Sequence, residues 1–347
     1  MATQEEFAGR LMGAFNDGAL CLMISVGHRT GLFDTMAAMP PATCAEIAAT
    51  AELKERYVRE WLGAMVTSGV VEIDGETNRY HLPQGHAACL TRGPENMAGL
   101  AQYIAELGSV ESLIVDCFRN GGGVPYEKYP RFHEIMAEDS AQFVGAALEP
   151  LILPLVDGLV QRLQTGIHVL DVGCGRGLTM TRLAELYPNS HFKGLDFSRE
   201  TIDFAQADAS AKGLSNLTFQ AADAALPFGE NEFDWITSFD AIHDQGQPLE
   251  VLRNIHRALK PEGVYLMQEI RSSSHHHGDI GHPLGTVLYT VSCMHCMTVS
   301  LAQGGEGLGA MWGEETTRAY LQRAGFQSIE KRELPHDIQN NWYIVRK

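Results

Sequence analysis

Acids, glycines and histidines recur where short apolar runs of this sequence end, and the first such place is the most informative. Asp171 lies near the end of the apolar run 167–172, and Gly173, Gly175 and Gly177 alternate directly after it. The run is rich in β-branched residues, as buried parallel strands are, and a helical pattern follows. Glycines in such a turn let the backbone approach a ligand, and the helix start offers free N–H groups. The pattern predicts a nucleotide-like cofactor at this turn.

The spacing of the glycines separates two kinds of cofactor turn. A dinucleotide-binding turn has the pattern G-x-G-x-x-G. Here the third glycine comes one residue earlier, and Leu178 stands where that glycine would be. With Asp171 in the preceding strand, the pattern is D-x-G-x-G-x-G. It resembles motif I of the class I S-adenosylmethionine (SAM) methyltransferases, and a plain tight turn between strand and helix is the alternative.

Later segments follow in the order expected of that fold. Apolar runs at 191–196 and 217–223 end in Asp196 and Asp223, and two more strand-like segments follow before residue 267. An acid about 20 residues beyond the glycine turn can accept two hydrogen bonds from a ribose diol, which predicts this role for Asp196. The resemblance places Asp223 beside the adenine amino group. The cofactor site that it implies consists of Asp171, Gly173, Gly175, Gly177, Asp196, Phe197, Asp223, Ala224, Phe239 and Asp240.

Methyl transfer from a sulfonium needs an aligned nucleophile and, where that nucleophile carries a proton, a base. His243 lies just beyond the end of the fourth predicted strand, and imidazole titrates near neutrality. We therefore predict His243 as the general base, with His295 as the second candidate. A hydrogen-bonding wall residue is the alternative interpretation of His243. Asp240, nearer the strand end, is expected to contact the methionine amino group or to orient His243.

Two segments are expected to cover the site. Residues 271–313 form an insertion on the carboxyl side of the sheet, where ligands bind in open α/β sheets, and we interpret it as a helical active-site cap. Glycine and proline at 121–130 predict a mobile loop that closes over the substrate. A surface loop with core aromatic residues is the alternative. The predicted substrate and lid residues are Tyr126, Tyr129, His133, Cys296 and Trp312.

A zinc site in the cap is a further alternative, because Cys293, His295 and Cys296 are close in sequence and zinc takes three or four such ligands. The histidines between residues 275 and 282 would have to supply the remaining ligands. There is, however, no second cysteine pair at ribbon spacing, and Cys293 and Cys296 share a helix face with Met297. This favours an apolar cap helix, and we predict no bound metal.

The segment 40–85 predicts a winged helix. Thr43 and Glu46 give a capping-box signal at a first helix, a second helix follows at 54–67, and a hairpin signal comes after it. This fold often binds DNA, but residues 41–82 carry seven acids and four bases, and a DNA-reading helix is strongly basic. A mostly apolar helix is predicted before it at 4–31, and a dimer contact is a natural use for such a helix.

The acidic composition limits the classes of partner. Lysine and arginine number 26 and aspartate and glutamate 43, so the formal charge is −17. This argues against non-specific nucleic-acid binding and against anionic membrane surfaces. Seven scattered cysteines suggest no disulfide framework and indicate a reducing, cytoplasmic setting. The sequence shows no signal-peptide pattern and no run of the roughly 18 apolar residues that span a membrane.

Residues 240–245, 295–297 and 312–313 together resemble the winged-helix methyltransferase family that is well represented in mycobacteria and also found in animals. The resemblance covers nearly the whole chain. It implies an α/β fold, namely the class I methyltransferase (Rossmann-like) seven-stranded sheet with the last strand antiparallel, plus an N-terminal α-helical and winged-helix domain. The expected domains are 1–85 for dimerisation, 86–165 as helical linker and lid, and 166–347 for SAM binding.

The sequence therefore predicts a cytoplasmic, homodimeric SAM-dependent methyltransferase that acts on an oxygen or sulfur nucleophile of a small molecule, a hydroxyl, carboxylate or thiol, and releases S-adenosylhomocysteine (SAH). It predicts no nucleic-acid or membrane partner. Three alternatives stay open: a thiol S-methyltransferase that needs little base catalysis, a winged-helix regulator with SAM as its effector, and a catalytically inactive scaffold. The Met- and Cys-rich cap suits a soft, apolar acceptor.

Overall fold

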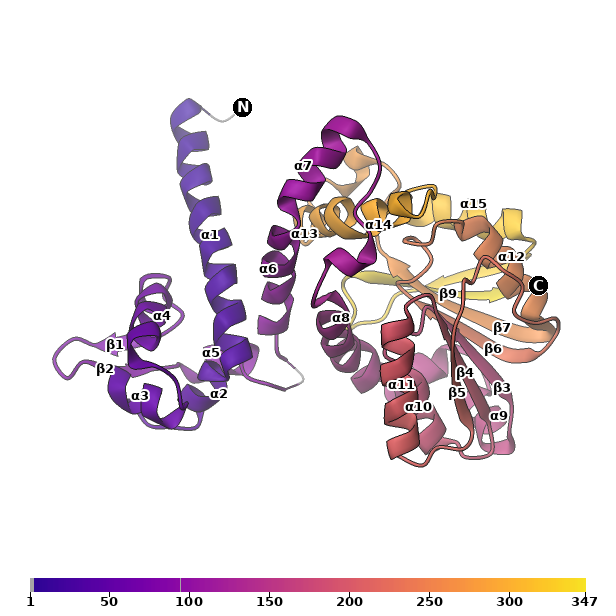
Figure 1. Ribbon diagram of the computed structural model, residues 1–347, viewed down its shortest axis with the longest axis horizontal. Helices are drawn as coiled ribbons and strands as arrows, with labels where there is room; N and C mark the ends of the chain where they lie inside the picture. Colours follow the sequence, from indigo (N-terminus) through magenta and orange to yellow (C-terminus); the bar gives the residue numbers. More distant parts are fainter. Residues whose placement is uncertain (1–2, 94) are drawn as a thin grey trace. The chain divides into compact units, whose positions relative to one another are not determined.

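The computed structural model describes residues 3–93 and 95–347. The chain divides into two compact units, residues 1–109 and 110–347 (Figure 1). This division falls inside the segment 86–165, so the role of that whole segment as linker and lid stays a prediction.

The first unit consists of helices and one β-hairpin. Thr43 accepts a hydrogen bond from the backbone N–H of Glu46, whose carboxylate accepts one from the N–H of Thr43, so the predicted capping box is confirmed. The two short strands pair antiparallel and form the wing. The elements are α1 (Gln4–Thr30), α2 (Leu32–Ala37), α3 (Cys44–Thr50), α4 (Glu55–Thr67), β1 (Glu72–Asp74), β2 (Arg79–His81), α5 (Gln84–Leu90) and α6 (Ala101–Ser109).

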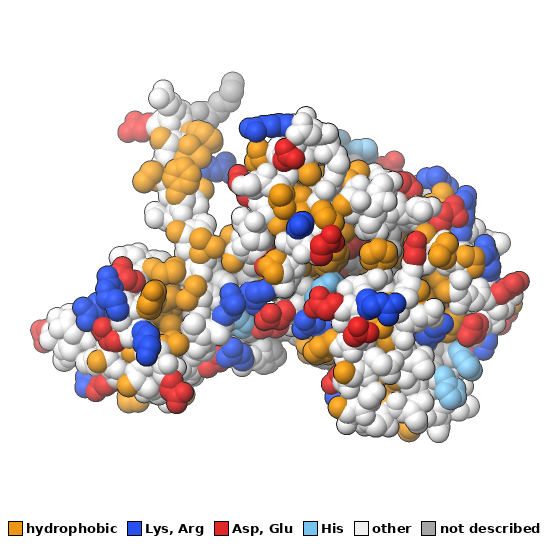
Figure 2. Space-filling view, viewed as in Figure 1, with side chains coloured by type: hydrophobic (Ala, Val, Ile, Leu, Met, Phe, Trp, Pro, Cys, Tyr) orange, Lys and Arg blue, Asp and Glu red, His pale blue; other side chains and the backbone are white. Residues whose placement is uncertain are grey.

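One aromatic pair anchors the core of this unit. Trp61 on α4 is buried against Phe33, with ring centroids 5.2 Å apart, and its indole N–H donates to the carbonyl of Met23 at 2.9 Å. Truncating such a buried aromatic side chain typically costs about 3–5 kcal/mol. The first turns of α1, in contrast, expose Phe7 and Phe15 on an apolar stretch that is visible in Figure 2.

The second unit is built on a seven-stranded sheet in the order β5-β4-β3-β6-β7-β9-β8. The first five strands of this order run parallel, and β9 is antiparallel to both β7 and β8. The predicted sheet with its antiparallel last strand is therefore confirmed. The strands are β3 (His168–Val172), β4 (His191–Asp196), β5 (Leu217–Ala221), β6 (Phe233–Phe239), β7 (Leu259–Ile270), β8 (Ser328–Arg332) and β9 (Asn340–Arg346).

Helices cover both faces of this sheet. One core cluster packs α9 (Leu159–Thr165), α10 (Leu178–Leu186) and α11 (Arg199–Ala211) on one face. A second cluster packs α12 (Pro248–Ala258) and α15 (Gly313–Ala324) on the other. The parallel strands are thus buried on both sides, which is why their sequences are continuous apolar runs.

The insertion after β7 is helical, as predicted. It contains α13 (Gly285–Val291) and α14 (Met297–Ala302), which a π-helical turn at Ser292–Cys296 joins into one continuous helix. Within the described residues one helix, 285–302, is long and apolar enough to cross a membrane. The core helices of globular domains can have the same length and apolar composition. Two more helices of the unit, α7 (Glu111–Asn120) and α8 (Phe132–Ser140), flank the segment 121–130.

The glycine-rich segment 121–130 packs on this cap helix. The backbone N–H of Val124 donates to the hydroxyl of Thr298 at 2.8 Å. A Cβ atom at Gly123 would lie only 2.0 Å from the carbonyl oxygen of Thr298, so no other residue fits there without movement. The tyrosine hydroxyl of Tyr129 donates to the carbonyl of Met294. These contacts hold the segment against the cap helix, and its opening as a lid stays a prediction.

Candidate active site

The glycine turn follows β3 and begins α10. The φ angles are 77° at Gly173, 52° at Gly175 and 71° at Gly177, a region that glycine adopts without steric cost. A Cβ atom at Gly173 would lie 2.3 Å from the Cβ of Ala241, and one at Gly177 would meet Phe219 at the same distance. A Cβ at Gly175 would find no described atom within 4 Å. The outer two glycines therefore permit close packing, and the middle one leaves its backbone open to a ligand.

A cavity of about 480 Å³ lies beside this turn. The carboxyl ends of β3, β4 and β6, the helix α14 and the segment 126–144 all contribute to its wall. Among the predicted site residues, the lining includes Asp171, Gly173, Gly175, Gly177, Asp196, Phe197, Ala224, Phe239, Asp240, Tyr126, Tyr129 and His133. The predicted residues that do not line it are Asp223, His243, His295, Cys296 and Trp312.

These last residues fall into two groups. Asp223 is exposed, and its carboxylate accepts a hydrogen bond from the N–H of Ala225 at 2.8 Å, so its contact with an adenine stays a prediction. His243, His295, Cys296 and Trp312 are buried, and His243 stands in the sequence between the lining residues Ala241 and Asp244.

Asp196 connects the second strand to the glycine turn. One of its carboxylate oxygens accepts a hydrogen bond from the N–H of Gly175 at 2.8 Å, and the other accepts one from the N–H of Ser198 at the same distance. The oxygen bonded to Ser198 also accepts from the Thr201 hydroxyl at 3.4 Å, whereas the oxygen bonded to Gly175 keeps a lone pair that can accept a hydrogen bond from a ligand in the cavity. This geometry suits the ribose role predicted for Asp196.

Five more acidic residues line the cavity, namely Glu127, Asp171, Glu200, Asp240 and Asp244. Burial raises the pKa of Asp171 to about 7, although the Thr237 hydroxyl donates to it at 2.7 Å. Burial also raises the pKa of Asp244 to about 7. Asp240 has a positive φ of 49°, and its Oδ1 atom is buried without a hydrogen-bond partner among the described residues. Strained backbone and an unpaired buried oxygen together mark Asp240 as a ligand-binding position.

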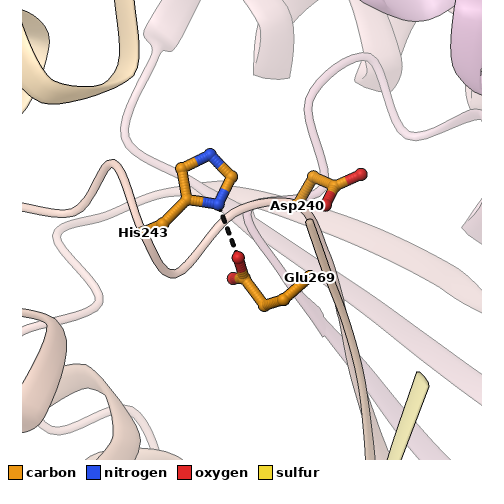
Figure 3. A group of neighbouring side chains, drawn as sticks. All are labelled: Asp240, His243 and Glu269. Atoms are coloured by element: carbon orange, nitrogen blue, oxygen red, sulfur yellow. Dashed lines mark hydrogen bonds and ion pairs between the residues drawn. The ribbon is translucent and has the colours of Figure 1, made fainter. Parts of the chain in front are cut away.

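His243 is held by a carboxylate that the sequence did not single out. Its Nδ1 atom lies 2.6 Å from Oε2 of Glu269, a completely buried residue near the end of β7 (Figure 3). Glu269 also accepts hydrogen bonds from the indole of Trp312 at 3.1 Å and from the N–H of Ile242 at 3.2 Å. These bonds fix the orientation of the imidazole and direct the proton on Nδ1 to Glu269, so Nε2 is the nitrogen left for chemistry.

The environment of His243 also changes its acidity. Burial alone would lower the pKa of the imidazole, but the Glu269 carboxylate and the Cys296 thiol outweigh that effect and raise the pKa well above its ordinary value. Burial lowers the pKa of His295 well below its ordinary value, and the nearby His243 and His133 lower it further. The two imidazoles therefore favour opposite charge states at neutral pH.

Aromatic rings cover the cavity from the side of α8. Tyr126 stacks on His133 with ring centroids 4.4 Å apart, and His295 stacks on Phe132 at 3.4 Å. Tyr129 meets His295 edge to face at 4.8 Å. We call these five rings the aromatic cover.

Metal binding stays untested by the fold. Among the described residues, the one group of three or more metal-binding side chains with ligand atoms within 4.8 Å is Asp240, His243 and Glu269. The hydrogen bond between His243 and Glu269 accounts for their closeness, and Figure 3 draws no hydrogen bond from Asp240 to either of them. Cys293 and Cys296 belong to no such group.

Sequence reasoning assigned no role to Asp244, Gln245, Arg176 or Glu269. Asp244 and Gln245 directly follow His243 and line the cavity, and Arg176 lies inside the glycine turn. Glu269 had a usable signal, because it is an acid near the carboxyl end of a predicted parallel strand, the same signal that identified Asp196.

The strand order and the glycine turn define a class I methyltransferase fold. Family models agree, since residues 18–92 match the Rv2258c-like winged HTH domain and residues 163–318 match a methyltransferase domain. The chain therefore carries a winged-helix domain followed by a methyltransferase domain, which confirms the arrangement that the sequence resembles.

Individual relatives agree with this assignment over parts of the chain. A demethylmenaquinone methyltransferase from Listeria monocytogenes is 34% identical over 106 residues, which is 30% of this chain and 45% of that protein. The chain thus matches less than half the length of that curated relative. Human N-acetylserotonin methyltransferase in complex with SAM superposes with a TM-score of 0.72 at 20% identity, covering 100% of this chain and 99% of the other. The mitomycin 7-O-methyltransferase MmcR gives a TM-score of 0.71 at 17% identity over 99% and 98% of the two chains.

Proposed function

We propose that this protein is a SAM-dependent methyltransferase that acts on a small-molecule nucleophile, with His243 as the general base. One observation carries the proposal: a cavity at the carboxyl edge of the sheet is lined by the glycine turn and Asp196, and the buried His243, paired with Glu269, stands in the sequence between lining residues. The methyltransferase domain match over residues 163–318 includes all of these residues.

The cavity fits the groups of SAM. The open backbone at Gly175 and the free lone pair of Asp196 suit the adenosine part, while the unpaired Oδ1 of Asp240 suits an ammonium group. Carboxyl groups at Asp171, Asp196, Asp240 and Asp244 line the wall, which suits a ligand that carries a sulfonium and an ammonium. We assign Asp223 to the adenine amino group by resemblance alone.

The chain's own residues would perform three tasks. Bound SAM would supply a methyl group on a positively charged sulfur, a good leaving group. Glu269 holds Nδ1 of His243, so that Nε2 can take the proton of the acceptor as the methyl group is transferred. The aromatic cover excludes water. Together, alignment and a positioned base typically contribute several orders of magnitude in rate.

The identity of the nucleophile distinguishes two forms of this proposal. A hydroxyl ionises with difficulty and needs the base at His243, whereas a thiol ionises more easily and needs mainly an apolar pocket. The cap offers apolar surroundings for a thiol, since Cys296 is buried beside His243 and Met311 and Leu288 pack in the same cluster. We propose O- or S-methylation, with the hydroxyl form favoured by the buried His243–Glu269 pair.

A SAM-responsive regulator is the second candidate function, because the first unit is a winged helix. On α4, Arg56 pairs with Glu60 and Arg59 with Glu55, each one helical turn away, so the charge available to phosphates is largely cancelled. This disfavours DNA reading by that helix. An inactive scaffold is disfavoured by the buried Glu269, which would be an expensive charge to retain without a use.

We also propose that the protein is a cytoplasmic homodimer. The support is the exposed apolar side chains of α1, among them Phe7, Leu11 and Phe15, together with the acidic charge and the scattered free cysteines. Sedimentation would test the dimer, and substitution of Phe15 by aspartate should shift it towards monomer.

Calorimetric titration with SAH, followed by a labelled-SAM screen against phenols, thiols and carboxylic acids, tests the main proposal. We expect SAH to bind and at least one acceptor class to take label. Binding without any label transfer would favour the regulator, and a DNA-binding assay would follow. Absence of SAH binding would contradict the cofactor assignment itself.

A further inference from the structure

His295 has an unusual hydrogen-bonding state. It is 1% exposed, and neither of its ring nitrogens has a hydrogen-bond partner among the described residues. An imidazole carries at least one N–H donor, and a buried polar group left unpaired costs about 1–3 kcal/mol. Native proteins rarely keep such a group without a functional reason.

The aromatic rings around His295 explain why no described protein group forms a hydrogen bond with it. Phe132 stacks on one face at 3.4 Å between centroids, and the rings of Tyr126 and Tyr129 meet it edge to face at 5.0 Å and 4.8 Å. Burial keeps its pKa well below the ordinary value. The imidazole is therefore neutral, with one donor and one acceptor, in a mostly apolar setting.

The position of His295 links the cavity to the base. It lies in the π-helical turn at Ser292–Cys296, a distortion that occurs frequently at functional sites. Val299 and Gln303, one and two turns further along the same helix, line the cavity. The next residue, Cys296, interacts with His243. Tyr126 and Tyr129, whose rings meet His295, line the cavity, so His295 contacts the cavity lining on one side and is next in sequence to the residue that interacts with His243.

Charge at this end of the cavity limits what the acceptor can be. Asp240 and Asp244 line it, and Glu269 lies buried near them. The arginines in the lining, Arg176 and Arg199, belong to the glycine turn and to α11, on the cofactor side. The cation at this end, protonated His243, is already paired with Glu269. A carboxylate acceptor would therefore be buried beside these acids with no unpaired cation among the described lining residues at this end, which is costly.

We propose that His295 binds the methyl acceptor through its neutral imidazole, and that the acceptor is an uncharged hydroxyl or thiol compound and not a carboxylate. The substrate's hydroxyl or thiol group supplies the hydrogen bond that His295 lacks in the acceptor-free protein. This inference rests on the proposed methyltransferase function and names the acceptor class of the same site.

Substitution of His295 by phenylalanine tests the first part. An aromatic ring is kept and no protein hydrogen bond is lost, so the thermal midpoint should stay the same or rise, and the affinity for SAH should stay within about twofold. The apparent affinity for the acceptor should fall about 2–10-fold, the value of one hydrogen bond. His295→Asn, which keeps a neutral donor and acceptor, should restore part of that loss.

His191→Phe is the matched control, because His191 lies exposed at the opposite end of β4 from the cavity and should change neither quantity. A lower thermal midpoint in His295→Phe would show that the imidazole supports the fold, and unchanged acceptor affinity would show that it does not bind the acceptor. Either result overturns the assignment of His295.

The acceptor class is tested with matched skeletons: phenol, benzenethiol and benzoate, and octanol, octanethiol and octanoate. With labelled SAM, or by ligand-observed NMR on the SAH-loaded protein, the neutral members should react or bind and the carboxylates should not. Asp244→Asn removes a carboxyl group whose pKa burial raises to about 7, so above that pH the variant should show a higher carboxylate-to-neutral ratio than the wild type. Equal use of both classes overturns the inference alone, whereas failure of SAH to bind overturns the proposed function.

Discussion

The cofactor half and the acceptor half of the site are assembled in different ways. The cofactor half consists of short contiguous pieces, the turn at 173–177 and Asp196, each at the end of its own parallel strand. The acceptor half draws on residues 126–133, on 243–245, on Glu269 and on the cap helix, which only packing brings together. Local backbone geometry therefore specifies the first half, and side-chain packing specifies the second.

The difference predicts which changes damage which step. Substitutions in the cofactor half should weaken SAH binding with little effect on turnover at saturating SAM. Substitutions in the acceptor half should lower turnover or acceptor affinity and leave SAH binding intact. A site in which both halves responded together would contradict this division.

Loss of the base should give the largest effect. His243→Ala removes the group that takes the acceptor's proton, so kcat for a hydroxyl acceptor should fall about 10²–10⁴-fold. The dissociation constant for SAH, measured by calorimetry, should stay within about twofold. A kcat equal to that of the wild type would show that His243 is only a wall residue, and a much smaller loss with a thiol acceptor would favour the S-methylation form.

Loss of the ribose acceptor should come next. Asp196→Ala removes a charged hydrogen-bond acceptor, which should weaken SAH binding about 10–100-fold. Because Asp196 also accepts bonds from Gly175 and Ser198, Asp196→Asn serves as the control that keeps part of this geometry. Wild-type affinity in the alanine variant would contradict the cofactor assignment.

The pH dependence of the reaction follows from the raised pKa of His243. Below that pKa both ring nitrogens are protonated, so kcat/KM for a hydroxyl acceptor should rise about tenfold per pH unit and then level off above it. Glu269→Gln removes the charge that raises the pKa, so the rising limb should move to lower pH. If the rising limb of kcat/KM stayed at the same pH in this variant, a group other than His243 would control the pH dependence.

The linked effect on stability has the opposite direction. Because folding raises the pKa of His243, its contribution to the free energy of unfolding is fully present below the ordinary imidazole pKa. It is lost as the pH rises through the folded-state value. Urea unfolding of wild type and His243→Ala at several pH values would measure this difference.

A change at the loop should give the smallest effect. Gly123→Ala places a Cβ atom 2.0 Å from the carbonyl of Thr298 and should push the segment 121–130 off the cap helix. Overpacking typically costs about 1–3 kcal/mol, so the acceptor KM should rise up to about tenfold with SAH affinity unchanged. Gly63→Ala is the control, because its Cβ would meet no described atom within 4 Å. An unchanged KM would show that the loop does not cover the acceptor.

Most of the fold could be predicted because local patterns carry it. The runs that end at Val172, Asp196 and Phe239 are strands, and the capping box at Thr43 and Glu46 begins a helix. Boundaries were less accurate, because sequence does not show where a ladder of hydrogen bonds stops. The strand expected at 217–223 ends at Ala221, which leaves Asp223 exposed and outside the cavity lining.

The site could be predicted only in part. His243 was found because it follows a strand in a recognisable order, but the sequence does not show that Glu269, 26 residues later, pairs with it. Likewise, Phe132 and His295 are 163 positions apart and stack directly on each other. Contacts of this kind depend on how distant helices and strands pack, and the hydrophobic periodicity of the sequence does not predict that packing.

The sequence by itself determined the parallel sheet, the glycine turn and the class of cofactor, because these depend on backbone geometry and on residues within a few positions of one another. Only the tertiary structure decided that Glu269 orients His243, that His295 is buried without a hydrogen-bond partner, and that carboxyl groups surround the acceptor end of the cavity. The physical reason is that charge state and hydrogen-bond satisfaction depend on burial and on neighbours, and packing of distant segments creates both.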